Sequence, residues 1–207
     1  MTLRLNGSSS GYTEIDAPAA AGNNTLTLPT GNGSADQVLK TNGSGALSFA
    51  SVPLLAITEV DQWYLTADHT SNATLTNLSR NGYDGATQIG TGMSVSSGVF
   101  TFPSTGKWLI CVQASFVIAV SDSVILNTQV TLNNSTFTTV TVASDGATNA
   151  SGTPRNGGAS SMYFMDVTDT SLTKVQFVAS SLDTGSQVNG HGSRIETGFV
   201  FIRLGDT

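Results

Sequence analysis

The chain has 207 residues, which is enough for one large domain or two small ones with a real core. Only 11% of the residues are charged, the formal net charge is −6, and the eight lysines and arginines are scattered one at a time. No basic patch could release several counterions from a phosphate backbone, so the composition excludes a nucleic-acid-binding protein.

The sequence also lacks the features of exported, disulfide-rich and membrane-inserted proteins. The first ten residues hold no apolar run of the kind that a signal peptide carries, and no stretch approaches the ~20 apolar residues of a membrane span. Cys111 is the only cysteine, so an internal disulfide framework is excluded. It stands among apolar residues, so we expect a buried, unreactive thiol. For the chain as a whole we expect neither insertion into a membrane nor a cleaved leader peptide.

Residues 1–52 form a distinct region of short alternating segments separated by clusters of turn residues. The segments are Leu3–Leu5, Tyr12–Ile15, Thr25–Leu28 and Ala46–Phe49. Asn-Gly pairs between them, such as Asn6-Gly7 and Asn42-Gly43, favour tight turns. One copy of so short a module has too few apolar residues to bury a core. We predict β-hairpins that order against copies of themselves or against a larger surface; a flexible leader is the alternative.

Ser51-Val52-Pro53 marks the boundary to a second domain, residues 53–207, in which the alternation is stronger. The candidate strands are Ala56–Ile57, Gln62–Thr66, Gly98–Phe102, Lys107–Ala119, Ser123–Leu132, Thr136–Ala143, Ser160–Val167, Lys174–Ala179 and Ile195–Leu204. No helical period persists for three turns, so we predict an all-β fold with antiparallel strands in a jelly-roll β-sandwich. The glycine-rich segments 144–159 and 183–193 are expected to be loops at an end of this sandwich.

The segment Ser96–Ile110 has aromatic and branched residues at a two-residue spacing, with Pro103 and Gly106 between its halves. This pattern predicts a hairpin. Its second strand is apolar on both faces over Lys107–Ala119. One face carries Trp108, Ile110, Val112, Ala114, Phe116 and Ile118, and the other carries Leu109, Cys111 and Val117. A strand that is apolar on both faces must be covered on both, and a neighbouring subunit is a candidate for the second cover.

No motif in the sequence points to a metal or a cofactor. His69 and His191 each lack a second ligand at metal-binding spacing, and no nucleophile elbow is present. We therefore expect exposed loop histidines, no zinc site and no cofactor, and a calcium ion bound by loop oxygens stays open without an EF-hand spacing to support it.

Two pairs of carboxylates were considered as a glycosidase site. Glu59 and Asp61 precede Trp63, whereas Asp166 and Asp169 flank a short turn. The spacing of the second pair is typical of turn chemistry at a strand end. We expect structural roles for both pairs, no catalytic residues and no enzymatic activity.

Several separated blocks of the chain match a known family in order. The blocks are DQWYLTADHT, NLSRNG, IGTGMSVSSGVFTFPSTGKWLI, FMDVTDTSLTKVQF and FVFIRLGDT. Together they resemble a C-terminal domain of marine bacteriophage virion structural proteins, which is similar to the trimeric jelly roll of tumour necrosis factor and the globular heads of the first complement component. The likeness covers residues 60–207. The first fifty residues, from GYTEIDAPAAAG to GSGALSF, also resemble a module that precedes such heads in phage fibre-type proteins.

The resemblance implies a ten-stranded sandwich assembled as a homotrimer, with aromatic faces meeting at the three-fold axis. The candidate residues for the core or for that subunit seam are Phe100, Phe102, Trp108, Phe116, Phe199 and Phe201. Left exposed, such rings would form an adhesive patch. The family offers no catalytic motif that could be transferred to this chain.

The expected function is that of a non-enzymatic virion protein, assembled in the host cytoplasm. As a short fibre or fibre tip, the trimer would bind other capsid or tail proteins through residues 1–52 and a host surface glycan or protein through its distal loops. The alternative is a trimeric capsid decoration or cement protein, a head fibre, and the two readings stay open. A surface-glycan depolymerase and a secreted cytokine-like ligand are less favoured.

Overall fold

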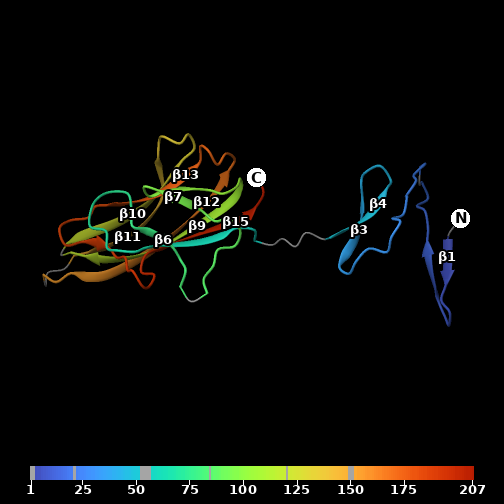
Figure 1. The fold of residues 1–207 in the computed structure, drawn as a ribbon, viewed down its shortest axis with the longest axis horizontal. Helices are drawn as coiled ribbons and strands as arrows, with labels where there is room; N and C mark the ends of the chain where they lie inside the picture. The colour runs from blue at the N-terminus through green and yellow to red at the C-terminus, as the bar shows by residue number, and fades with distance from the viewer. Residues whose placement is uncertain (1–2, 21, 52–56, 84, 120, 149–151) are drawn as a thin grey trace. The chain divides into compact units, whose positions relative to one another are not determined.

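The computed structural model describes residues 3–20, 22–51, 57–83, 85–119, 121–148 and 152–207 (Figure 1). It divides the chain into two compact units, Met1–Ala56 and Ile57–Thr207. The sequence placed this division four residues earlier, after residue 52. Of the predicted boundary Ser51-Val52-Pro53, only Ser51 lies within the described residues. Of the predicted strand Ala56–Ile57, only Ile57 does, and it is not in a strand. No helix in the described ranges is long and apolar enough to cross a membrane.

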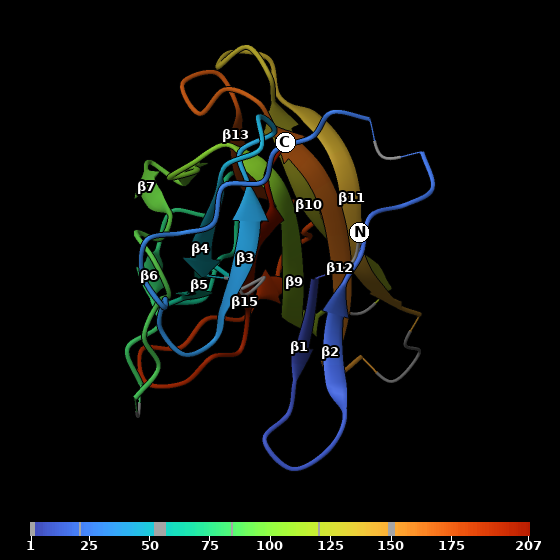
Figure 2. The same cartoon turned by 90° about the vertical axis from the view of Figure 1, so that its right-hand side faces the viewer.

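The N-terminal unit contains two hairpins, which Figure 2 shows as separate pairs of arrows. The strands are β1 (Leu3–Asn6), β2 (Tyr12–Ile15), β3 (Gln37–Thr41) and β4 (Leu47–Ser51). The predicted strand Thr25–Leu28 is wrong, because only Thr27 forms an isolated bridge, to Ala46. Strand β3 was missed because its adjacent Val38 and Leu39 break the alternation by which short strands are recognised.

The C-terminal unit is a sandwich of two antiparallel sheets, as predicted. One sheet has the order β11-β10-β13-β8-β7 and the other β12-β9-β15-β5-β6, with β14 also paired to β9. We call them the five-stranded and the six-stranded sheet. The bounds are β5 Val60–Leu65, β6 Leu78–Arg80, β7 Ser94–Ser96, β8 Val99–Thr101, β9 Gly106–Ile118, β10 Asp122–Thr131, β11 Thr138–Ala147, β12 Arg155–Val167, β13 Lys174–Ser180, β14 Gln187–Val188 and β15 Gly198–Gly205.

The predicted hairpin within Ser96–Ile110 is wrong. Strand β8 pairs with β7 and β13, whereas β9 pairs with β12, β14 and β15 in the other sheet. The chain therefore crosses from one sheet to the other between them. Pro103 has no amide hydrogen for a hairpin ladder. Phe102 and Trp108 instead meet inside the sandwich, with ring centroids 5.2 Å apart.

A cluster of aromatic rings from both sheets fills the sandwich. Phe177 of the five-stranded sheet stacks on Phe199 of the six-stranded sheet at 3.9 Å between centroids, and Phe100 lies edge-on to Trp63 at 5.3 Å. The alternation observed in β9 is the one that the sequence predicts, since the six apolar residues at every second position from Trp108 to Ile118 are buried and the residues between them are not. Burial of one such side chain contributes about 1.5–3 kcal/mol.

The segment 144–159 was predicted to be a loop, but most of it is strand. Strand β11 continues to Ala147 and β12 begins at Arg155; residues 149–151 lie outside the described part. The side chain of Asp145 joins the two strands and thus the edges of the two sheets. Its Oδ1 accepts a hydrogen bond from Arg155 at 2.6 Å, and its Oδ2 accepts one from the amide of Gly158 at 3.1 Å.

These bonds lead to a prediction for acidic solution. Burial of Asp145 opposes its ionisation, but hydrogen bonds from Gly146, Gly158 and Arg155 outweigh it and lower the pKa below the ordinary 3.8. The stabilisation is therefore present above pH 3.8 and is lost as the pH falls through the lowered folded value. We expect the free energy of unfolding of Asp145→Asn to fall less steeply than that of the native chain below pH 3.8. Urea titrations over this range measure it, and parallel curves would contradict it.

Candidate functional site

The six aromatic residues proposed for the core or the subunit seam all lie in the sandwich core. Phe100, Phe116, Phe199 and Phe201 are 0% exposed, and Phe102 and Trp108 are 1% exposed. Their rings are thus inside the protomer, and any surface offered to a partner is made by other residues.

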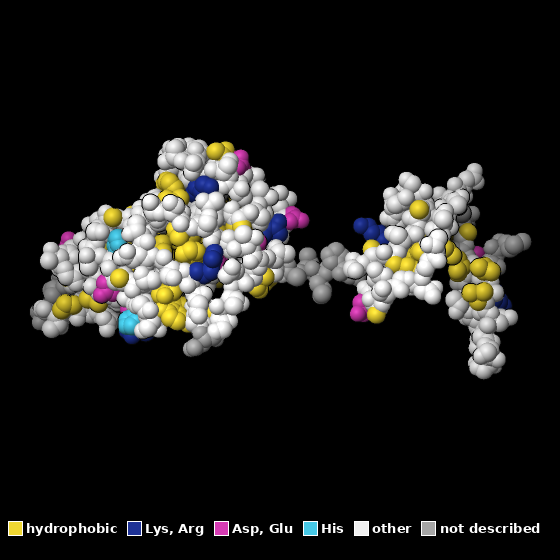
Figure 3. Space-filling model, viewed as in Figure 1, with side chains coloured by type: hydrophobic (Ala, Val, Ile, Leu, Met, Phe, Trp, Pro, Cys, Tyr) yellow, Lys and Arg dark blue, Asp and Glu magenta, His cyan; other side chains and the backbone are white. Residues whose placement is uncertain are grey.

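The outward face of the six-stranded sheet carries two rows of side chains that are apolar except for Gln62 at the β5 end of the second row. The register across β12, β9, β15 and β5 aligns Phe164, Leu109, Ile202 and Val60 in the first row. It aligns Met162, Cys111, Val200 and Gln62 in the second. We call these two rows the apolar strip. Met162 and Phe164 at its β12 edge are 70% and 55% exposed, so the described residues leave more than half of each side chain in solvent. Figure 3 shows hydrophobic side chains on the surface of both units.

Polar residues bound the strip on both sides. At one end Lys107 and Asp166, which are opposite each other on β9 and β12, form an ion pair. At the other end the next row begins with Ser160 and Gln113. An apolar area framed by polar residues is typical of a surface that another protein covers.

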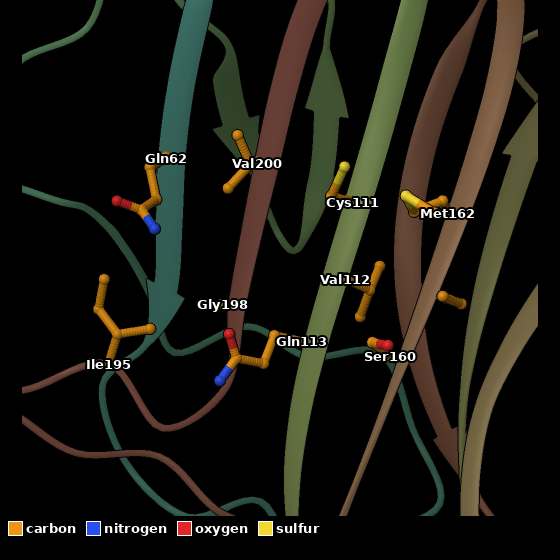
Figure 4. A pocket seen from close by; sticks show the side chains of 10 residues that line it. Gln62, Cys111, Val112, Gln113, Ser160, Met162, Ile195, Gly198 and Val200 are labelled. Carbon is orange, nitrogen blue, oxygen red and sulfur yellow. The ribbon is translucent and has the colours of Figure 1, made fainter.

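A hollow of about 380 Å³ lies within this face (Figure 4). It extends from Gln62 and Val200 past Gly198 to Gln113 and Met162. Gly198 keeps it open, because it contributes no side chain between its neighbours. A Cβ atom there would come within 2.8 Å of Ile195, so an alanine would project into the hollow and displace that side chain.

The chain covers the β5 end of the same face with its own segment 81–93. Tyr83 lies against Tyr64 with ring centroids 5.2 Å apart, and its hydroxyl donates a hydrogen bond of 2.9 Å to the Tyr64 hydroxyl. This bond, with smaller contributions from burial and from the charge of Tyr64, raises the pKa of Tyr83 to about 12. Among the described residues of the C-terminal unit, the part of the face formed by β15, β9 and β12 is left open.

The outward face of the five-stranded sheet is different in kind. Its side chains are bonded to one another in a polar ladder, in which Gln176 donates to Gln129 at 2.9 Å and Gln129 donates to Thr139 at 3.2 Å. Asn127 donates to Ser180 at 2.7 Å. The polar groups of these side chains have hydrogen-bond partners within the face and in the surrounding water. The five-stranded sheet thus presents a face of mostly bonded polar side chains with Val142 exposed among them, whereas the six-stranded sheet presents the apolar strip.

The carboxylates of Glu59 and Asp61 hold segment 81–93 in place. Glu59 accepts bonds from the amides of Thr91 and Gly92 at 3.2 and 2.9 Å. Asp61, which is 1% exposed, accepts one from the amide of Met93 at 2.7 Å and pairs with Arg80 at 2.9 Å. Gly92 has a φ of +74°, and a Cβ atom there would lie 2.8 Å from the Asp61 carboxylate. The sequence did not indicate this anchoring role.

The second carboxylate pair is divided between two structural contacts. Asp166 pairs with Lys107, as described above. Asp169 accepts bonds from the hydroxyl and the amide of Ser171, at 2.6 and 2.8 Å, and these lower the pKa of Asp169. His191 accepts a bond from the amide of Ser193 at 3.0 Å. The described residues contain no group of three or more side chains arranged to hold a metal ion.

Cys111 was predicted to be buried, and this is wrong for the protomer. Its side chain lies on the outward face of β9, between Met162 and Val200, and is only partly covered. Partial burial raises the pKa of the thiol, which favours the unreactive neutral form.

Comparison with known proteins identifies the fold. No family model and no curated protein matches the sequence. Among solved structures, the chain is similar to Eiger TNF from S. frugiperda, with a TM-score of 0.58 and 10% identity over 73% of this chain and 96% of that one. It is also similar to murine APRIL at pH 5.0, with a TM-score of 0.52 and 10% identity over 70% of this chain and 98% of that one. The protein thus contains a jelly roll of the tumour necrosis factor type.

Proposed function

We propose that this chain is a non-enzymatic structural protein of a bacteriophage particle and forms a homotrimeric surface appendage, a short fibre or fibre tip. The sequence blocks within residues 60–207 that resemble phage virion proteins support the viral assignment. The jelly-roll fold supports a trimer, because the tumour necrosis factor family that the sequence resembles assembles in this way.

The apolar strip is the observation that carries the homotrimer. Phe164 protrudes from β12, which is the edge strand of the six-stranded sheet, and does not line the hollow around Gly198, whose border on β12 includes Met162. Protruding and receiving parts occupy different places on one surface. Copies therefore join head to tail, and such contacts close into a ring when the rotation allows it.

The host contact is assigned to the end of the sandwich at which β9 turns into β10. The segments that meet there include 181–186, whose hydroxyl and amide groups suit hydrogen bonds to a glycan or a protein surface. Each such contact is weak, and three-fold repetition multiplies its effect. Residues 1–52 would attach the trimer to other virion proteins.

Labelling of intact particles tests the viral role and separates its two forms. Antibodies against the C-terminal unit should mark a few positions at the tail if the chain is a fibre or fibre tip. Labels at many points of the capsid would favour the decoration protein instead. Particles without any label would overturn both.

Purified protein tests the expected absence of enzymatic activity. Purified trimer incubated with host envelope polysaccharide is expected to release no new reducing ends. Release of sugar that survives Asp166→Asn and Glu59→Gln would place a depolymerase site elsewhere in the chain.

A further inference from the structure

The first hairpin of the N-terminal unit is a two-faced sheet. Cross-strand partners share a face, and the register of β1 and β2 sorts the side chains cleanly. One face carries Leu3, Leu5, Thr13 and Ile15, and the other carries Arg4, Asn6, Tyr12 and Glu14. The first face has no charge, and the second holds both charges of the hairpin.

The polar face is satisfied within the hairpin. Arg4 donates a hydrogen bond of 2.9 Å to Glu14, and its guanidinium lies 4.0 Å from the centre of the Tyr12 ring. The other face has no comparable partner, because Leu3, Leu5 and Ile15 remain 58%, 56% and 63% exposed. A two-stranded sheet by itself is marginally stable in water, and three or more strands with a shared apolar face are needed.

In the second hairpin, too, the largest apolar pair lies on the face opposite to the charged side chain. Leu39 stands opposite Phe49 on one face, and Lys40 points from the other. Gly33 lies against the Phe49 ring, so closely that a Cβ atom there would be 2.6 Å from it. Leu39 nevertheless stays 50% exposed. The first hairpin thus keeps its charged side chains away from the face that needs a cover, whereas in the second hairpin Val38, which is 48% exposed, shares the face of Lys40.

We propose that two further copies of this chain provide that cover, so that residues 1–51 of three copies form a common β-stem around the trimer axis. This inference rests on the proposed homotrimer. A trimeric head holds its three N-terminal units together at an effective concentration on the order of millimolar. Uncharged faces meet there without like-charge repulsion, and three hairpins supply enough strands for a shared core. The polar faces then point outward, where virion proteins reach them.

Hydrogen exchange on the full-length trimer tests the stem. We expect the amides of residues 3–15 to exchange at least about 100-fold more slowly than those of an unstructured chain. The double change Leu5→Ser and Ile15→Ser is expected to abolish this protection while residues 106–118 of the head keep theirs. The control Asn6→Ser, on the polar face, should leave the protection unchanged.

Cross-linking gives a second measurement. In a Cys111→Ser background, Leu5→Cys should be linked between chains by a short bismaleimide at any protein concentration, and Asn6→Cys far less. A head that sediments as a trimer while residues 3–15 exchange like an unstructured chain would overturn the stem alone. A monomeric full-length chain would overturn the stem together with the homotrimer.

Discussion

Replacement of Phe164 by Glu is expected to convert the proposed homotrimer into monomers of 21.3 kDa. Phe164 is 55% exposed in the protomer, so its burial between subunits contributes about 1.5 kcal/mol, roughly half the value of a fully buried ring. A carboxylate in its place adds a desolvation cost of several kcal/mol. A closed ring repeats the change at every interface, which raises the dissociation constant by several orders of magnitude. Sedimentation velocity at micromolar concentration measures the outcome.

Val142→Glu is the matched control for this change. Val142 is also a strand residue and is 46% exposed, but it lies on the outward face of the five-stranded sheet, opposite Asn127. That face needs no partner, so this variant should remain trimeric. A trimer of Phe164→Glu, or equal dissociation of both variants with native near-ultraviolet circular dichroism, would contradict the assignment of the interface.

The long strands of the sandwich were predictable because their pattern is local. In β9 the period of two persists from Trp108 to Ile118, so both its existence and its buried face followed from the sequence. The errors occur where tertiary contacts decide. The short strands β6 and β7 carry three residues each, too few to show a period. The sheet that the chain enters after Phe102 depends on where the Phe102 ring packs, and no residue next to it in the sequence determines this.

The apolar strip was predictable only in part. The second apolar face of β9, at Leu109 and Cys111, could be predicted from the residue pattern, and it made a neighbouring subunit a candidate for the second cover. The rows themselves depend on the register between strands that are far apart in the chain. Phe164 and Ile202 are aligned only because both are paired to Leu109. A local pattern carries no information on such an alignment.

Replacement of Arg80 by Met is expected to lower the free energy of unfolding by about 3 kcal/mol, since it leaves a buried carboxylate without its cation. Asp61 is 1% exposed and would keep only its bonds from the Trp63 ring nitrogen at 2.8 Å and the Met93 amide at 2.7 Å. The loss stays at the low end of the usual range because a third of the Arg80 side chain is in solvent. Denaturant titration of the Phe164→Glu monomer measures it without a contribution from assembly.

Arg194→Met is the control, because its ion pair with Glu196 lies at the surface, where 62% of the arginine side chain is exposed. Such pairs contribute at most about 1 kcal/mol. The double variant with Asp61→Asn removes the buried charge itself and should recover part of the loss caused by Arg80→Met. A cost no larger than that of Arg194→Met would show that Asp61 does not depend on its cation.

The effect of Arg80→Met should also reach the assembly. Arg80 donates to the carbonyl oxygen of Met93, so it holds both ends of segment 81–93. This segment covers Tyr64 and, with Gln62 and Val200, borders the open part of the strip. If it loosens, Gln62 and Val200, which line both the pocket against this segment and the hollow, lose a packing partner. We therefore expect trimers of Arg80→Met to dissociate at higher protein concentration than native trimers do, although no residue of the strip has been changed.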